Sequence, residues 1–229
     1  MWLFGIFCNN IFIELGEYII MKKIMDFIKA HLDFGVYQVT WVAIAVFLSI
    51  PFLLKYMPQK YGYENGLLES IQMVVLFVIL ALCLTAKVNK RFFRFCALIL
   101  TILMIREVNC GRTLFFKVPG TENSFYPWRE IKYGYLVHPI YGAYIAIIAL
   151  FFFIKKHFIT LWKLVKGTKL PFWNIAFACF AMFMGAIAEK ATNNNFIFEE
   201  GFELLFYVSL AGIVYLYSRH ENFMIEAEE

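Results

Sequence analysis

Charged side chains interrupt the apolar runs of this sequence at a few places. At two of these places the residues could bind a ligand or take part in a reaction. One apolar run ends in Arg106 and Glu107, and Arg112 follows after four intervening residues. Another run ends in Glu189. A glutamate at the C-terminal end of a helix is opposed by the helix dipole, so each of these carboxylates needs a cation nearby. Arg106 and Arg112 are the obvious candidates, with Lys190 as a weaker one, and they predict an ion-pair cluster.

The start of the last apolar segment carries a second set of polar side chains. Glu199, Glu203 and Tyr207 are spaced four residues apart, which places them on one helical face. Two glutamates at this spacing repel one another unless they share a cation, an arginine or a proton. Glu203, like Glu69, also lies inside an apolar stretch, where acidic side chains usually face the interior of a helix bundle.

These polar residues all lie at the ends of apolar segments that we expect on one side of the helix bundle. We therefore predict one polar site, and its candidate members are Glu69, Arg106, Glu107, Arg112, His138, Glu189, Asn193, Glu199, Glu203 and Tyr207. The alternative interpretation is a structural network of ion pairs that only fixes helix packing. For Glu64 and Glu199, stabilisation of a helix N-terminus would be a sufficient role.

The residue types limit the chemistry that this site could perform. Zinc sites need several histidine or cysteine ligands, and His138 is the only histidine expected on this side. Carboxylate and amide oxygens suit Ca²⁺, Mg²⁺ or Mn²⁺, so a divalent cation held by the carboxylates is one hypothesis. Neighbouring carboxylates could also act as acid and base. The sequence has no P-loop, nucleophile elbow or Ser–His pair, and it leaves the cofactor open.

The composition indicates which elements must position these residues. Of 229 residues, 62% are hydrophobic and 17% are charged, whereas soluble domains carry about 25% charged residues. The apolar residues fall in runs of about 20, the length that crosses a bilayer as a helix. We predict an all-α, polytopic membrane helix bundle with spans at Tyr37–Met57, Leu67–Ala86, Phe92–Ile105, Tyr135–Ile154, Pro171–Ala188 and Phe202–Ser218.

The basic loops predict the orientation of this bundle. Residues 87–94 contain four basic side chains and residues 155–170 contain five, and neither segment has an acid. Basic loops of this kind stay in the cytoplasm. Both termini are then cytoplasmic, the protein is a multi-pass protein of the inner (cell) membrane, and the polar site faces outward. The net charge of +4 comes mostly from these basic loops, which determine the orientation in the membrane. Nucleic-acid binding is not expected, because no exposed basic surface is indicated.

Three regions follow from these assignments. Residues 1–36 form a cytoplasmic or interfacial N-terminal segment, residues 37–218 the six-span domain, and residues 219–229 an acidic cytoplasmic tail. Residues 1–20 fit neither a cleaved signal nor a clean span. They either precede a true start at Met21 or form a helix on the membrane surface. The outer loop 117–134 is rich in aromatic residues and is either an interfacial belt or a lid over the site.

Two short segments carry a resemblance. "REVNCGR" at the end of one span and "EEGFELL" at the start of the last resemble motifs of a loose group of polytopic bacterial membrane proteins. Those proteins have an acidic pair and an aromatic residue after a span and an E-E-x-x-E-like element later. Here Arg106 replaces the first acid, Cys110 replaces the aromatic residue, and the later acids are spaced differently. The group has no assigned activity, so the resemblance implies a bacterial membrane protein and nothing further.

We carry three functional hypotheses. The leading one is binding or transport of a small ion or polar solute, and transport predicts polar residues that continue toward the cytoplasm, for which only Gln72 and Asn174 qualify. The second is an enzyme acting on a lipid or lipid-linked substrate, whose headgroup would enter from the outer leaflet. It predicts a lateral opening. The third is a structural or partner-binding subunit, which predicts fully paired charges and no cavity. An oligomer is compatible with all three.

Overall fold

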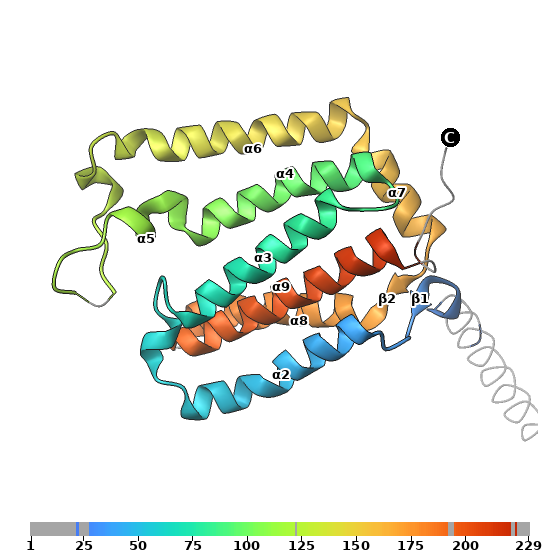
Figure 1. Ribbon diagram of the computed structural model, residues 1–229, viewed down its shortest axis with the longest axis horizontal. Coiled ribbons are helices and arrows are strands. Elements are labelled where there is room, and N and C mark those ends of the chain that lie inside the picture. Colours follow the sequence, from blue (N-terminus) through green and yellow to red (C-terminus); the bar gives the residue numbers. More distant parts are fainter. Residues whose placement is uncertain (1–21, 23–27, 122, 192–194, 221–222, 224–229) are drawn as a thin grey trace, which may run out of the picture.

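The computed structural model describes residues 22, 28–121, 123–191, 195–220 and 223, without the side chains of Glu189 and Ala191. This described part is a helical bundle (Figure 1). Its long helices are α2 (Gln38–Tyr56), α3 (Leu67–Leu84), α4 (Lys90–Glu107), α6 (Val137–Ile154), α8 (Phe172–Ala191) and α9 (Phe196–Arg219). Shorter elements are β1 (Leu32–Asp33), α5 (Arg112–Phe115), α7 (His157–Gly167), β2 (Leu170–Pro171) and 3-10 helices at Gln59–Gly62, Asn109–Gly111, Trp128–Glu130 and Gly134–Leu136.

Each predicted span coincides with one of the six long helices, which confirms the all-helical fold class. Four helical segments are long and apolar enough to cross a membrane, namely Gln38–Tyr56, Gln59–Leu84, Gly134–Ile154 and Phe196–Arg219. Helix α4 has charged residues at both ends, and the apolar run of α8 is the shorter Phe172–Ala188. The two remaining predicted spans are therefore helices that are less typical of a membrane span, α4 by its composition and α8 by the length of its apolar run.

Two element boundaries differ from the sequence prediction. Helix α9 begins at Phe196, six residues before the predicted start at Phe202, because the Asn195 side chain accepts a hydrogen bond from the Phe198 amide at 3.3 Å and caps the helix. The second difference is α7, a helix of 11 residues in the segment that we expected to be a basic loop. Glu199 and Glu200 interrupt the first turns of α9, and Lys163 and Lys166 lie within α7, so a search for uniformly apolar runs passes over both segments.

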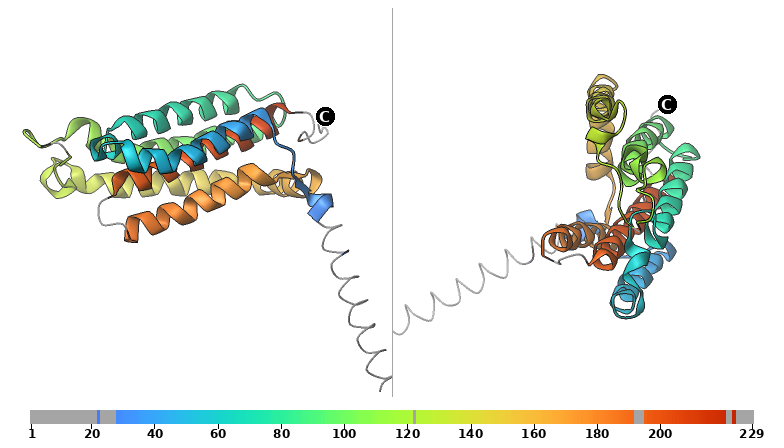
Figure 2. Two further views of the ribbon diagram at one scale, coloured as in Figure 1. Left: turned by 90° about the horizontal axis from the view of Figure 1, so that it is seen from below. Right: turned by 90° about the vertical axis from the view of Figure 1, so that its left-hand side faces the viewer.

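Helix α9 lies at the centre of the bundle and packs against α8, α3 and α2 (Figures 1 and 2). Its side chains Leu205, Tyr207 and Leu216 are fully or almost fully buried. Helix α6 lies at the edge and buries only Ile148. Large apolar side chains instead point outward on α2, α6 and α8, such as Phe52, Phe153 and Phe183, each more than 60% exposed. Outward-facing apolar surfaces of this extent are typical of lipid-facing helices.

The two ends of the bundle differ in charge. We call the end where α3 and α9 begin and α4 ends the glutamate end. The opposite end, where α4 and α8 begin and α6 ends, is the lysine end, and it includes residues 87–94 and 155–169. At the lysine end β1 pairs with β2 in a two-stranded parallel sheet. The predicted N-terminal segment 1–20 and most of the acidic tail lie outside the described residues.

Close packing of α8 on α9 depends on Gly212. The buried Asn174 accepts a hydrogen bond from Thr40 of α2 at 2.7 Å, and its Nδ2 lies so near α9 that a Cβ at Gly212 would be 2.0 Å away. Small residues at such positions let membrane helices approach and bond through polar side chains. Asn174 of α8 therefore contacts both α2 and α9.

This packing predicts the effect of a single methyl group. Gly212→Ala should destabilise the fold by about 1–3 kcal/mol, because Asn174 must move and release Thr40. The control is Gly142→Ala on α6, where nothing lies within 4 Å of the added Cβ. That variant should be neutral or slightly more stable. Thermal unfolding of both purified variants in one detergent makes the comparison, and equal midpoints would contradict this role of Gly212.

Candidate functional site

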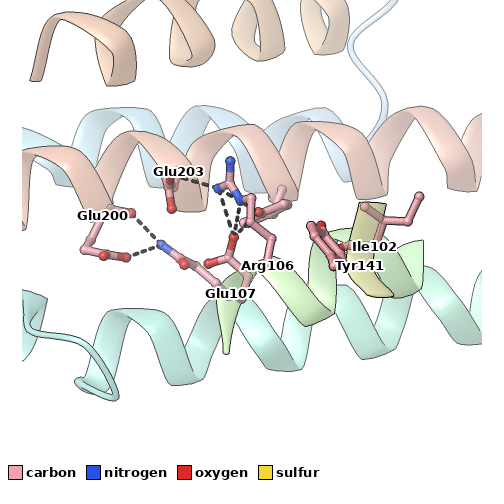
Figure 3. Close-up of polar contacts among 8 residues, drawn as sticks. Ile102, Arg106, Glu107, Tyr141, Glu200 and Glu203 are labelled. Atoms are coloured by element: carbon pink, nitrogen blue, oxygen red, sulfur yellow. Dashed lines mark hydrogen bonds and ion pairs between the residues drawn. The ribbon is translucent and has the colours of Figure 1, made fainter. Parts of the chain in front are cut away.

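Helices α4 and α9 bring Arg106, Glu107 and Glu203 together at the glutamate end (Figure 3). The Arg106 guanidinium donates from Nη2 to Glu107 Oε1 and to Glu203 Oε1, both at 2.9 Å. The Tyr207 hydroxyl donates to the same Glu107 oxygen at 2.5 Å. One carboxylate oxygen thus accepts from two side chains, and Arg106 joins the end of α4 to the second turn of α9.

The local sequence explains this geometry. Glu107 is the last residue of α4, where the helix dipole opposes its charge, and Arg106 beside it supplies the compensation. The Glu107 side chain is 5% exposed, whereas that of Arg106 is 55% exposed. The spacing of Glu203 and Tyr207 along α9 places both on the face that meets α4. The predicted ion pair of Glu107 with Arg106 is therefore present in the structure.

A second polar group joins α3 to α9 beside the first. Gln72 donates from Nε2 to the Glu200 carboxylate at 2.7 Å and to the Glu200 carbonyl at 3.0 Å. Glu69, in the first turn of α3, accepts from the backbone amide of Asn65. Asn65 in turn donates from its side chain to the carbonyl of Thr113. Neighbouring carboxylates are thus held by different helices and face a common space.

That common space is a pocket of about 210 Å³, which we call the glutamate pocket. Six of the nine residues that line it are glutamates. The lining consists of Glu64, Glu69, Arg106, Glu107, Asn109, Thr113, Glu199, Glu200 and Glu203. Only one lining residue is basic, so acidic side chains outnumber basic ones six to one.

A second cavity adjoins the glutamate pocket on the side of α8. It has a volume of about 370 Å³, and we call it the α4–α8 cleft. Small side chains of α8 form one wall, and apolar side chains of α4 and α9 form the others. Its lining is Leu103, Arg106, Ala181, Met182, Gly185, Ala186, Glu199, Glu203, Phe206 and Tyr207. Arg106, Glu199 and Glu203 line both cavities, so an apolar cleft leads to the charged groups.

Some predicted site residues are placed elsewhere. Arg112 does not pair with Glu107 but lies 3.7 Å from Glu64, because the turn at 109–111 carries it toward the start of α3. His138 is exposed and packs edge-on against Trp128, at a centroid distance of 6.1 Å. Asn193 and the side chain of Glu189 lie outside the described residues.

The loop 117–134 does not contribute to the lining of either cavity, as far as its residues are described. Lys117 and Phe125 form an antiparallel bridge within the loop, and Arg129 lies 3.9 Å from its neighbour Glu130 with both side chains exposed. The loop therefore closes on itself, and the structure does not support the interpretation of this segment as a lid.

Sequence reasoning missed several members of the site. Glu200 is absent from the predicted site, and Gln72 is predicted only as a step on a transport path. One signal could have found them, since Gln72 follows Glu69 by three residues and Glu203 follows Glu200 by three. This spacing places each pair on one face of its helix.

The arrangement favours binding of positive charge. Among the described residues, no three His, Cys, Asp or Glu side chains are arranged to hold a metal ion. The glutamates are spread around the pocket wall, and the cation among them is the Arg106 guanidinium.

Comparisons of the chain with protein-family models, with curated proteins and with solved structures found no match.

Proposed function

We propose that this chain is a multi-pass inner-membrane protein whose glutamate pocket faces outward and binds a small cation or the cationic group of a polar solute. The apolar outer surfaces of α2, α6 and α8 support the membrane placement. The basic segments 87–94 and 155–169 support the orientation, because basic loops stay in the cytoplasm. The glutamate end is then the outer end.

The observation that carries this proposal is the charge of the pocket lining. Six glutamates and one arginine surround a space of about 210 Å³, which suits an ion or a small solute. A cleft lined by one sign of charge concentrates ligands of the opposite sign. A purely structural network, by contrast, predicts fully paired charges and no cavity. Below the pocket, Leu76, Ile79 and Leu100 fill the core, which supports binding at the outer end over a continuous transport path.

The proposal is tested by titrating the purified protein with sodium, calcium and tetramethylammonium chlorides at constant ionic strength. At least one of the three cations should raise the unfolding midpoint in a saturable way, because a ligand that binds only the folded state stabilises it. Glu203→Gln should lower the affinity for that cation about tenfold or more, since it removes a charged acceptor shared by both cavities.

The matched control is Glu130→Gln, which removes the same charge from an exposed site beside Arg129. This variant should bind the cation as the unmodified protein does. If none of the three cations gives a saturable shift, or if both variants keep the original affinity, cation binding at this pocket is wrong.

The α4–α8 cleft favours a second candidate, an amphiphile with a cationic head, as expected for an enzyme acting on a lipid or lipid-linked substrate. An alkyl chain in this cleft would contribute about 0.8 kcal/mol per buried methylene. Octyltrimethylammonium should then bind at least tenfold more tightly than tetramethylammonium. Gly185→Leu, which fills the cleft, should remove this gain, whereas Gly142→Leu on α6 should retain it. Equal gains in both variants would exclude the cleft as the chain site.

A further inference from the structure

Helix α7 presents an apolar face that the rest of the described chain leaves uncovered. Phe158, Leu161, Trp162 and Val165 follow the spacing of one helical face, and their side chains are 39–60% exposed. Ile159 lies beside them and is also exposed. In Figure 1 this helix turns away from α6 and runs obliquely across the lysine end of the bundle. Its direction thus differs from that of the long helices.

The opposite face of α7 fixes the helix to the bundle. His157 is buried and stacks on Phe95 of α4, with ring centroids 4.4 Å apart and planes inclined by 16°. Burial, together with the positive charges of Arg91 and Lys155, lowers the pKa of His157 and favours the neutral ring. Leu164 is buried in the core one turn before the helix ends. The orientation of α7 is therefore fixed, and its exposed apolar face has a defined direction.

Exposed lysines surround this apolar face. They are Lys155, Lys156, Lys163, Lys166 and Lys169. Lys166 lies over the Trp162 ring at 4.5 Å from its centroid. Arg91 and Arg94, at the start of α4, are exposed at the same end. The segments 70–106 and 131–188 that form most of this end contain no Asp or Glu. Asp33 of β1 is an acid at this end, and it accepts from Tyr37 and from the Gly35 amide.

We propose that α7 lies flat in the membrane interface at the lysine end and binds anionic lipid headgroups through its lysines. An amphipathic helix with aromatic and aliphatic residues on one face and lysines beside them is typical of helices that lie in the interface. A helix that crosses the end of a membrane bundle lies near the plane of the bilayer surface. Positive charge at this position attracts the anionic lipids of the cytoplasmic leaflet. This inference needs the membrane placement but not the cation site.

The depth of Trp162 gives the first test. The full chain is placed in nanodiscs made with lipids that carry bromine near the headgroup end of the acyl chain, and again with bromine near the chain terminus. The fluorescence that is lost in Trp162→Phe reports this side chain alone. We expect stronger quenching by the shallow bromine. Absence of quenching by either lipid would overturn the proposal, and a cross-link from this face to a second protein would assign it to a protein partner instead.

The lysines give the second test. Lys163→Gln, Lys166→Gln and Lys169→Gln are combined in one variant, which still retains the buried His157 and Leu164 anchors. Its enrichment of phosphatidylglycerol over phosphatidylcholine, measured by native mass spectrometry from mixed nanodiscs, should fall at least tenfold, since each lysine near an anionic surface contributes roughly fivefold and the loss of any two already exceeds tenfold.

The matched control changes three exposed lysines at the glutamate end, Lys55→Gln, Lys60→Gln and Lys132→Gln, and removes the same total charge. This control should keep the phosphatidylglycerol enrichment. The proposal is overturned if the two triple variants retain the lipid equally, or if the control loses more of it. Loss of cation binding at the glutamate pocket in Glu203→Gln would leave the phosphatidylglycerol enrichment unchanged. The two proposals can therefore be contradicted independently of one another.

Discussion

Arg106→Gln is expected to destabilise the folded protein by about 3–5 kcal/mol, the cost of leaving the buried Glu107 carboxylate without its cation. Glu107 would be affected most, because its carboxylate is 5% exposed and, within the described part of the chain, would retain the Tyr207 hydroxyl as its hydrogen-bond donor. Glu203, now without its cation, would repel it. For a chain of this size the midpoint of thermal unfolding should fall by roughly 6–20 °C.

Arg112→Gln provides the matched control for this result. Arg112 lies 3.7 Å from Glu64, whose side chain is 41% exposed, so this pair is longer and its carboxylate is far more solvated than that of Glu107. Pairs of this kind contribute about 0–1 kcal/mol. The two arginine variants should therefore differ by several degrees in the same detergent. Equal midpoints would show that the Arg106 pair is as solvated as the Arg112 pair.

A double variant separates charge from shape at the same site. Adding Glu107→Gln to Arg106→Gln removes the unpaired carboxylate, while the amide can still accept from Tyr207. The double variant should recover part of the stability that Arg106→Gln loses, because the interaction energy of directly contacting residues is not additive. If the double variant loses as much stability as the two single variants together, the two side chains are not coupled.

Sequence patterns were sufficient for the helices and for the central ion pair. The apolar runs located all six long helices, since a charge-free run of about 20 residues leaves few other structures. Glu107 at a helix C-terminus required a cation, and the neighbouring Arg106 provides it. The four-residue spacing of Glu203 and Tyr207 also placed both correctly on one face of α9. These predictions follow from local geometry within a single helix.

Other parts of the site depend on how different helices are juxtaposed. The partner of Arg112 is determined by the turn at 109–111, where Cys110 and Gly111 have positive φ angles of 53° and 86°. No periodicity predicts that turn. The contact of Gln72 with Glu200 requires α3 and α9 to pack in one particular register. The lining of the α4–α8 cleft comes from three helices, α4, α8 and α9, and their packing cannot be predicted from any one of these helices alone.

The sign of the electrostatic potential in the glutamate pocket tests the central claim without knowledge of the ligand. Asn109, which lines the pocket, is replaced by cysteine in a background without other cysteines. Intact cells are then treated with either of two impermeant methanethiosulfonate reagents, the cationic trimethylammonium-ethyl form or the anionic sulfonatoethyl form. Thr121→Cys in the outer loop and Lys90→Cys at the lysine end are the reference positions.

The measured quantity is the ratio of the cationic to the anionic labelling rate, normalised to a small free thiol. An outward-facing pocket lined by six glutamates should raise this ratio at position 109 about tenfold or more above the ratio at position 121. Position 90 should remain unlabelled. A ratio at position 109 that is equal to or lower than that at position 121 would contradict a cation-attracting pocket, and labelling at position 90 instead of 109 would contradict its outward orientation.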